Sequence, residues 1–319
     1  MAKKTVKLKR YSGNPILKPV KNHSWERYVF NCAALLLDNK IHLVYRALGK
    51  DKVSRLGYAS SKDGFKIEER LKKPIYLPKI KAESKIVKSK NTGVEDPRLT
   101  QIGNRIYLTY AASDGRTSQV ALASIKIRDF LEKKWNWKRH GVLFPGRANK
   151  NAVLFPEKIK GRYVLYHRIE PNVWVSYSSD LKKWSAPKVV MRPRKKMWDS
   201  VKIGAGAPPI KLKNKWLFIY HGVGREPASA PLSRALAGRK EKYIYRLGYA
   251  LIDAKNPEKI LFRSKEPILE PVKDYEKRGQ VPNVVFSCGA VIKGKKLLVY
   301  YGGADTVIGV ASTDLDKLF

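Results

Sequence analysis

Cysteine is scarce in this chain: among 319 residues only Cys32 and Cys288 occur. Two cysteines make neither a disulfide framework nor a thiolate metal cage, so small stapled or zinc-held proteins are excluded, and reduced thiols are expected. No apolar run approaches the roughly 20 residues that a membrane helix needs. The first ten residues carry positive charges with no apolar stretch behind them, unlike a secretory signal. The sequence therefore predicts a cytoplasmic protein with no membrane partner.

Acidic residues are also few, because 27 Asp and Glu stand against 66 Lys and Arg, a formal charge of +39. Such an excess attracts nucleic acid, anionic polymers or phosphorylated substrates, but it does not determine a fold. No His, Cys or Asp cluster has ligand spacing, so no metal is predicted. Neither a Gly-x-Ser-x-Gly elbow nor a glycine-rich nucleotide loop is present. Apolar residues make up 43%, enough for a sizeable core, which excludes disorder.

What the sequence does contain is one unit repeated five times. Each copy has a Gly or Asn turn, a basic residue and an apolar strand ending in tyrosine, the pattern of a β-hairpin. A strand with small residues follows each hairpin. The five terminal tyrosines are Tyr45, Tyr110, Tyr166, Tyr220 and Tyr300.

Proline-flanked segments predict how the repeats are assembled. Proline cannot donate to a central ladder, so each such segment is expected to be an outer edge strand. The fifth repeat ends without one, and the spare copy lies at 14–19. We therefore expect residues 1–319 to form one domain, an all-β, five-bladed β-propeller whose N-terminal strand completes the last blade. A helical turn is expected near 127–133. The segments after repeats one to four are 73–78, 141–145, 188–193 and 266–271.

The innermost strands of a propeller line its central channel, where ligands bind. In this chain those strands carry polar residues where a structural strand would be apolar, as in Gly-Val-Glu-Asp-Pro-Arg at 93–98. A partly desolvated Asp96 can be a general acid, although an Asp–Arg salt bridge explains the same residues. His167 and His221 share one repeat register, and either a functional or a packing role fits them. The predicted innermost segments are 29–33, 93–98, 149–156, 202–209 and 283–289.

Several of these motifs, taken in order, resemble those of glycoside hydrolase family 130. They lie at 93–98, 153–158, 198–209, 219–223 and 301–305, so the resemblance extends over nearly the whole chain. Members of that family are five-bladed propellers, mostly inverting β-mannoside phosphorylases, with some β-1,2-mannosidases. The resemblance implies a manno-oligosaccharide as substrate, inorganic phosphate as co-substrate and no cofactor.

The resemblance also implies roles for individual residues. Asp96 is the catalytic acid, whose proton reaches the glycosidic oxygen through the mannosyl 3-hydroxyl while phosphate attacks the anomeric carbon and α-mannose 1-phosphate is released. A phosphorylase needs cations rather than a second carboxylate, because phosphate arrives as an anion. Phosphate is assigned to Lys150, Arg168, Lys202 and His221. Substrate contacts are assigned to Asn31, Arg46, Glu95, Arg98, Asp199, Tyr245, Phe286 and Asp305.

Other interpretations remain open at this point. A β-1,2-mannosidase would cleave the same bond with water, and a non-catalytic propeller could bind a polyanion through the basic stretches at 79–90, 133–139 and 192–196. A solvated surface explains those stretches as well, and no nucleic-acid motif accompanies them, so nucleic acid is not expected as a partner. Glu157 is expected to pair with a nearby lysine. The acceptor sugar, the β-1,4 or β-1,2 linkage and a homo-oligomer are left open, the first two depending on loops 193–198 and 224–242.

Overall fold

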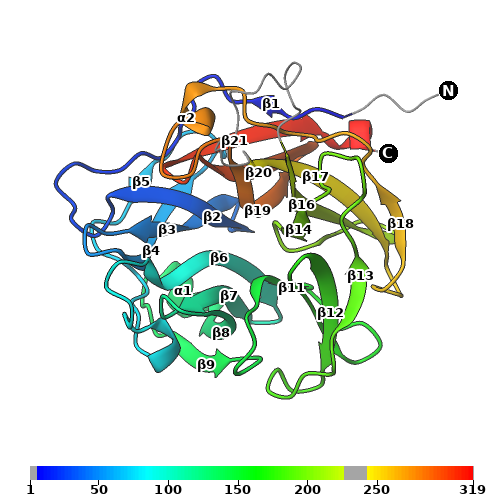
Figure 1. The fold of residues 1–319 in the computed structure, drawn as a ribbon, viewed down its shortest axis with the longest axis horizontal. Helices are drawn as coiled ribbons and strands as arrows, with labels where there is room; N and C mark the ends of the chain where they lie inside the picture. The colour runs from blue at the N-terminus through cyan, green and yellow to red at the C-terminus, as the bar shows by residue number, and fades with distance from the viewer. Residues whose placement is uncertain (1–5, 226–242, 319) are drawn as a thin grey trace, which may run out of the picture.

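The computed structural model describes residues 6–225 and 243–318, and strands predominate in them (Figure 1). Consecutive antiparallel strands form five units, which we call repeats one to five. Repeat one holds β2 (Tyr28–Leu37), β3 (Lys40–Leu48), β4 (Val53–Ser61) and β5 (Glu69–Arg70). Repeat two holds β6 (Thr92–Ile102), β7 (Arg105–Ser113), β8 (Ser118–Lys126) and β9 (Lys138–Val142).

The later repeats have the same order. Repeat three holds β10 (Lys150–Leu154), β11 (Tyr163–Ile169), β12 (Asn172–Ser178) and β13 (Lys188–Met191). Repeat four holds β14 (Lys202–Ala205), β15 (Ile210–Lys211), β16 (Lys215–Arg225), β17 (Tyr243–Asp253) and β18 (Ile260–Arg263). Repeat five holds β19 (Val285–Lys293), β20 (Lys296–Gly303), β21 (Val307–Asp314) and β1 (Lys9–Arg10). Within the described residues the short helices are α1 (Ile127–Leu131), α2 (Asp274–Lys277) and two 3-10 turns, Lys81–Glu83 and Leu315–Leu318.

The predicted hairpin turns are present. Asp38 and Asn39 join β2 to β3 with φ of 46° and 55°, the positive values that a type I′ turn requires. Gly103 and Gly294 take positive φ at the equivalent turns of repeats two and five. Helix α1 lies within the range predicted to be helical.

The outer edge strands differ from the prediction. Segment 188–193 does contain β13, and 141–145 overlaps β9. Elsewhere the outer strand lies earlier in the chain, and the proline-flanked segment makes a single bridge: Tyr76 to Leu56, Leu269 to Leu247 and Leu17 to Ile308. Because proline removes an N–H and fixes φ, these segments make one short bridge each and cannot continue a ladder.

The N-terminal segment joins the sheet of repeat five, as the sequence predicted, but through β1 rather than through 14–19. Lys9 lies opposite Ser312 and Arg10 opposite Ala311 in the antiparallel pair with β21. Arg10 also donates to both carboxylate oxygens of the buried Glu276, at 2.7 and 2.9 Å. The two ends of the chain are therefore held in one sheet.

Each repeat shares a hydrophobic cluster with the next, and repeat five shares one with repeat one. In the cluster between five and one, Leu43 and Tyr45 pack with Leu298 and Val310. Figure 1 shows the strand groups around a common centre, with β2, β6, β14 and β19 nearest to it. Repeats one and two are further joined by a short parallel pairing of β4 with β6.

The repeated tyrosines have a shared environment. In four repeats the tyrosine hydroxyl donates to a buried carboxylate that also binds an arginine. These sets are Tyr45–Glu26–Arg70, Tyr110–Glu83–Arg139, Tyr220–Asp199–Arg263 and Tyr301–Glu276–Arg10. We call each of them a tyrosine–carboxylate–arginine set. In repeat five the member is Tyr301 and not the predicted Tyr300, whose hydroxyl donates to the carbonyl of Gly64. Tyr166 of repeat three donates instead to the carbonyl of Pro257.

Both cysteines are free and buried, Cys32 in β2 and Cys288 in β19. These two strands pack against each other, as expected for equivalent strands of neighbouring repeats. No helix within the described residues has the length and apolar character needed to cross a bilayer.

Candidate active site

Three inner strands carry a polar residue at a β-bulge in an equivalent position. Asn31, Asp96 and Asn151 have φ of 49°, 52° and 52°, and each lies at a register shift between its strand and the next. Asn and Asp tolerate this left-handed conformation better than other side chains, and a bulge re-aims the side chain that it carries. The local backbone therefore places an amide or carboxylate side chain at the same bulge position in three neighbouring repeats.

Asp96 lies in a buried network of charges. Its Oδ1 accepts from Asn31 Nδ2 at 2.9 Å and from Arg46 Nη1 at 3.1 Å. Arg46 Nη2 donates to Glu95 Oε1 at 2.8 Å, and Lys150 Nζ donates to Glu95 Oε2 at 3.1 Å. Glu95 therefore bridges a predicted sugar contact, Arg46, and a predicted phosphate ligand, Lys150.

The pKa values of Asp96 and Asp305 are shifted in opposite directions. Burial alone would raise the pKa of Asp96, but the charges of Arg46, Arg98 and Lys150 and the hydrogen bond from Asn31 hold it well below its usual range. Burial raises the pKa of Asp305 to about 7, helped by the negative charges of Asp96 and Glu95 and opposed by Arg46. Of these two carboxyl groups, the site therefore favours the protonated form of Asp305 over that of Asp96.

Three of the predicted phosphate ligands lie close together. Lys150 of β10 is opposite Arg168 of β11 in the strand register. Arg168 Nη2 and Lys202 Nζ each lie 3.0 Å from Oε1 of Glu170. Arg168 is buried, and its Nε has no hydrogen-bond partner among the described residues. The arrangement is a set of three cations with hydrogen-bonding capacity to spare.

His221, the fourth predicted phosphate ligand, is buried beside this set. Neither ring nitrogen has a partner among the residues that the structure describes. Burial and the nearby charges of Arg168, Arg98 and Lys202 hold its pKa well below the usual value, so the ring is neutral. His221 therefore offers a hydrogen bond where the sequence predicted a positive charge.

Local packing explains where the His221 ring lies. Gly204 leaves room for it, because a Cβ there would come within 2.5 Å of its Cε1. Phe286 packs on the ring with centroids 4.4 Å apart, and Tyr245 stacks at 6.3 Å. His167, in the same register, is by contrast satisfied by Asn149 and Ser176, and burial lowers its pKa to about 3. The packing role is the one that the structure gives to His167.

Two predicted substrate residues have their polar atoms occupied by the protein. Asp199 accepts from Arg194, Arg263 and Tyr220, and it belongs to the tyrosine–carboxylate–arginine set of repeat four. Arg98 is fully buried and donates to the carbonyls of Asp96, Ala205 and Gly206, so it ties β6 to β14 and the residue that follows β14. Sugar contacts by these two residues stay predictions. Glu157 pairs with Lys211 at 2.6 Å, as expected.

The structure adds residues to the site that the sequence did not indicate. Ser54 accepts from Arg46 Nε at 3.0 Å. Asn151 is buried, and its Oδ1 has no partner among the described residues. The repeat register could have found Asn151, because it is equivalent to Asn31 and Asp96. No motif indicates Glu170, since its importance comes from strands β11 and β14 meeting.

Of the two loops expected to select the acceptor sugar, the structure describes 193–198 in full and 224–242 only at its start. Loop 193–198 packs on repeat four, where Trp198 Nε1 donates to the carbonyl of Lys265 at 2.9 Å. Of loop 224–242, residues 226–242 lie outside the described residues.

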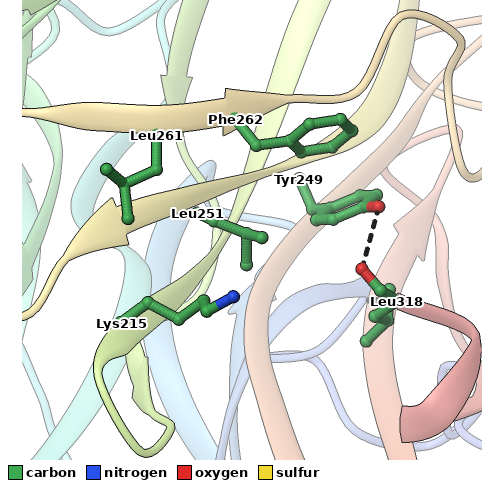
Figure 2. A pocket seen from close by; sticks show the side chains of 6 residues that line it. All are labelled: Lys215, Tyr249, Leu251, Leu261, Phe262 and Leu318. Carbon is green, nitrogen blue, oxygen red and sulfur yellow. Dashed lines mark hydrogen bonds between the residues drawn. The ribbon is translucent and has the colours of Figure 1, made fainter.

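A separate hollow lies on the outer side of repeat four (Figure 2). Leu261 and Phe262 of β18, Tyr249 and Leu251 of β17, Lys215 and Leu318 line it. None of the predicted site residues is among them. This hollow is mostly apolar, and it is not the candidate active site.

Comparison with known proteins identifies the family to which this chain belongs. The family model for glycoside hydrolase family 130, described as β-1,4-mannooligosaccharide phosphorylase, matches residues 5–319. Two Thermoanaerobacter proteins, a 1,2-β-oligomannan phosphorylase and a β-1,2-mannobiose phosphorylase, are 41% and 43% identical over 98% of this chain and 99% of their own length.

Solved structures are similar over the whole chain as well. The Listeria innocua β-1,2-mannobiose phosphorylase in complex with β-1,2-mannobiose has a TM-score of 0.79 at 27% identity, with 98% of both chains covered. A second structure, from work on glycoside hydrolases of this family that target β-1,2-mannosidic linkages in Candida mannan, has a TM-score of 0.82 at 27% identity over 99% and 96% of the two chains. The family model and the two relatives together show that this chain belongs to glycoside hydrolase family 130.

Proposed function

We propose that this chain cleaves β-1,2-linked manno-oligosaccharides with inorganic phosphate and releases α-mannose 1-phosphate with inversion. The β-1,2 linkage is favoured because the two relatives above 40% identity are named for β-1,2-mannan or β-1,2-mannobiose. The description of the family model names the β-1,4 linkage, so the linkage is a property of this branch and not of the family.

The observation that carries the proposal is the set of cations next to the carboxylates. Lys150 donates to Glu95, whose chain neighbour is Asp96, and it lies opposite Arg168 in the strand register. A doubly charged phosphate needs several donors at once, and cations held in a mostly buried site stabilise it near the developing positive charge of the sugar. A hydrolase acting on water needs a second carboxylate there instead.

The reaction requires one proton and one nucleophile. A phosphate oxygen bonds to the anomeric carbon while the bond from that carbon to the glycosidic oxygen breaks, and the proton goes to the departing oxygen. Asp96 supplies the proton through the mannosyl 3-hydroxyl, with Asn31 and Arg46 holding its carboxylate. The pKa of Asp96 is held below its usual range in this network, so Asp96 must first take up this proton from solvent and then deliver it. Burial raises the pKa of Asp305 to about 7, and the charge of Asp96 contributes to that shift.

The proposed fold of this chain is a single five-bladed propeller over residues 1–319. Support comes from the five hydrophobic clusters, each between consecutive repeats, with the fifth between repeats five and one. A ring of five sheets needs such a cluster at every junction, whereas an open stack leaves one junction unpaired. A cytoplasmic location stays a prediction.

The test offers β-1,2-mannobiose and β-1,4-mannobiose with and without inorganic phosphate. We expect α-mannose 1-phosphate from the β-1,2 substrate and little cleavage when phosphate is omitted. Free mannose formed equally fast without phosphate would show a β-1,2-mannosidase instead. Faster cleavage of the β-1,4 substrate would overturn the linkage, and Asp96→Asn should lower either activity by at least about 100-fold.

A further inference from the structure

Glu170 connects the cations that the proposed function assigns to phosphate. Its Oε1 lies 3.0 Å from Arg168 Nη2 and 3.0 Å from Lys202 Nζ. Lys150 is near enough to act on Glu170 as well: burial alone would raise the pKa of this carboxyl, but Arg168, Lys202 and Lys150 together lower it. One carboxylate therefore contacts two of the four predicted phosphate ligands, Arg168 and Lys202, and a third, Lys150, acts on it through its charge.

The contacts of Glu170 are those that an oxyanion would make. A phosphate oxygen and a carboxylate oxygen accept the same charge-assisted hydrogen bonds from guanidinium and ammonium groups. Lys202 Nζ donates to one carboxylate oxygen of Glu170, and Arg168 Nη2 lies 3.0 Å from the same oxygen, so phosphate can take this place only where the carboxylate gives it up. Arg168 and Lys202 are less exposed than Glu170, with side chains 9% and 25% exposed.

Glu170 is more exposed than the three cations around it. Its side chain is 55% exposed, in contrast to Glu95, which bridges Arg46 and Lys150 with a side chain 5% exposed. It follows the last residue of β11, so its rotation does not disturb the strand. Within the described chain its carboxylate accepts a hydrogen bond from Lys202 and forms an ion pair with Arg168.

We propose that the Glu170 carboxylate competes with inorganic phosphate for Arg168 and Lys202. The carboxylate must swing away from these two cations before phosphate binds. This rests on the assignment of Arg168 and Lys202 to phosphate in the proposed function. The apparent phosphate affinity is then the intrinsic affinity multiplied by the fraction of molecules in which the carboxylate has moved. Glu170 thus sets the phosphate concentration at which the enzyme works, without touching the sugar.

Glu170→Gln tests the competition, because it removes the negative charge and keeps the size of the side chain. We expect the KM for phosphate to fall by about five- to tenfold, as for a carboxylate that holds the donors about nine-tenths of the time. The KM for β-1,2-mannobiose and kcat should stay within about twofold. At one phosphate concentration below KM, phosphate should also raise the thermal midpoint of this variant more than that of the wild type.

Glu157→Gln is the matched control, since Glu157 loses the same charge in an exposed pair with Lys211. Its phosphate KM should equal that of the wild type. A phosphate KM that is unchanged or higher in Glu170→Gln overturns the inference, because the carboxylate would then be a bystander or an aid in positioning the cations. If the wild type itself shows no phosphate-dependent cleavage, the proposed function fails, and that result is separate from any difference between variants.

Discussion

At the scale of single residues, the site separates charge by environment. Asp96 and Asp305 are both acidic, yet Arg46, Arg98 and Lys150 keep Asp96 ionised against its burial, whereas burial and the neighbouring carboxylates raise the pKa of Asp305 to about 7. Two carboxyl groups whose pKa values are driven apart in this way differ in protonation near neutral pH. The same contrast separates His221, neutral and unpaired within the described chain, from the cations around it.

The raised pKa of Asp305 predicts a pH-dependent contribution to stability. The folded protein binds a proton up to about pH 7, while the unfolded chain releases it near the ordinary value of about 3.9. This stabilisation is therefore complete below about pH 4 and is lost as the pH rises to about 7. Replacing Asp305 with Asn removes the dependence, so the thermal midpoint of Asp305→Asn relative to the wild type should be several degrees higher at pH 8 than at pH 4.

Thermal unfolding at the two pH values checks this prediction. Asp316→Asn, at an exposed carboxylate of the C-terminal 3-10 turn, is the control and should show no such change. Equal differences from the wild type at pH 4 and pH 8 would contradict the storage of a proton on Asp305.

At the scale of elements, the repeated tyrosine is a structural device. In repeat two, Glu83 has no exposed side-chain surface and accepts from Tyr110, from Arg139 and from the backbone N–H groups of Lys79 and Ile80. The carboxylate thereby fixes the connection between β5 and β6 to the middle strand β7. Asp199 has the equivalent position in repeat four, which is why its oxygens are occupied.

Glu83→Gln is expected to destabilise the protein. The substitution leaves Arg139 without its buried counter-charge, a change that typically costs about 3–5 kcal/mol of unfolding free energy. Glu132→Gln, at an exposed pair with Lys134, should leave the free energy of unfolding nearly unchanged. Urea unfolding of the two variants measures the difference, and equal midpoints would show that the set does not stabilise the fold.

At the scale of the whole molecule, charge and closure oppose each other. The formal charge of +39 means that positively charged side chains repel one another in any compact state. Against it stand the clusters between successive repeats and the N-terminal strand β1, which Arg10 fastens to Glu276. The molecule is therefore held by short-range packing under a long-range repulsion.

Added chloride should raise the thermal midpoint, because raising the ionic strength from about 0.01 M to about 0.1 M shortens the screening length from about 30 Å to about 10 Å. We expect a rise of a few degrees in sodium chloride, which is used instead of phosphate so that binding does not contribute. An equal concentration of sucrose, too dilute to act by exclusion and without charge, should leave the midpoint unchanged. A fall of the midpoint in chloride would mean that surface ion pairs outweigh the repulsion.

Much of the site could be predicted from the sequence, and the failures have specific causes. Asp96 and its charged neighbours stand out in the sequence because charge on an inner strand departs from the repeat. Glu170 does not, because its partner Lys202 comes from another repeat, and Asn151 does not, because its bulge is visible only in the backbone conformation. Three of the five outer strands were misplaced because proline marks the end of a ladder more reliably than the ladder itself.

The sequence by itself determined the repeated hairpins, their turns and the joining of the N-terminus to the last sheet. These features depend on local backbone preferences and on the order of segments, and both are written along the chain. The tertiary structure alone decided which charges meet: Glu170 with Arg168 and Lys202, Glu95 with Arg46 and Lys150, and Asp199 with Arg194. Electrostatic interaction depends on distance and burial in space, and neither can be read from positions in a sequence.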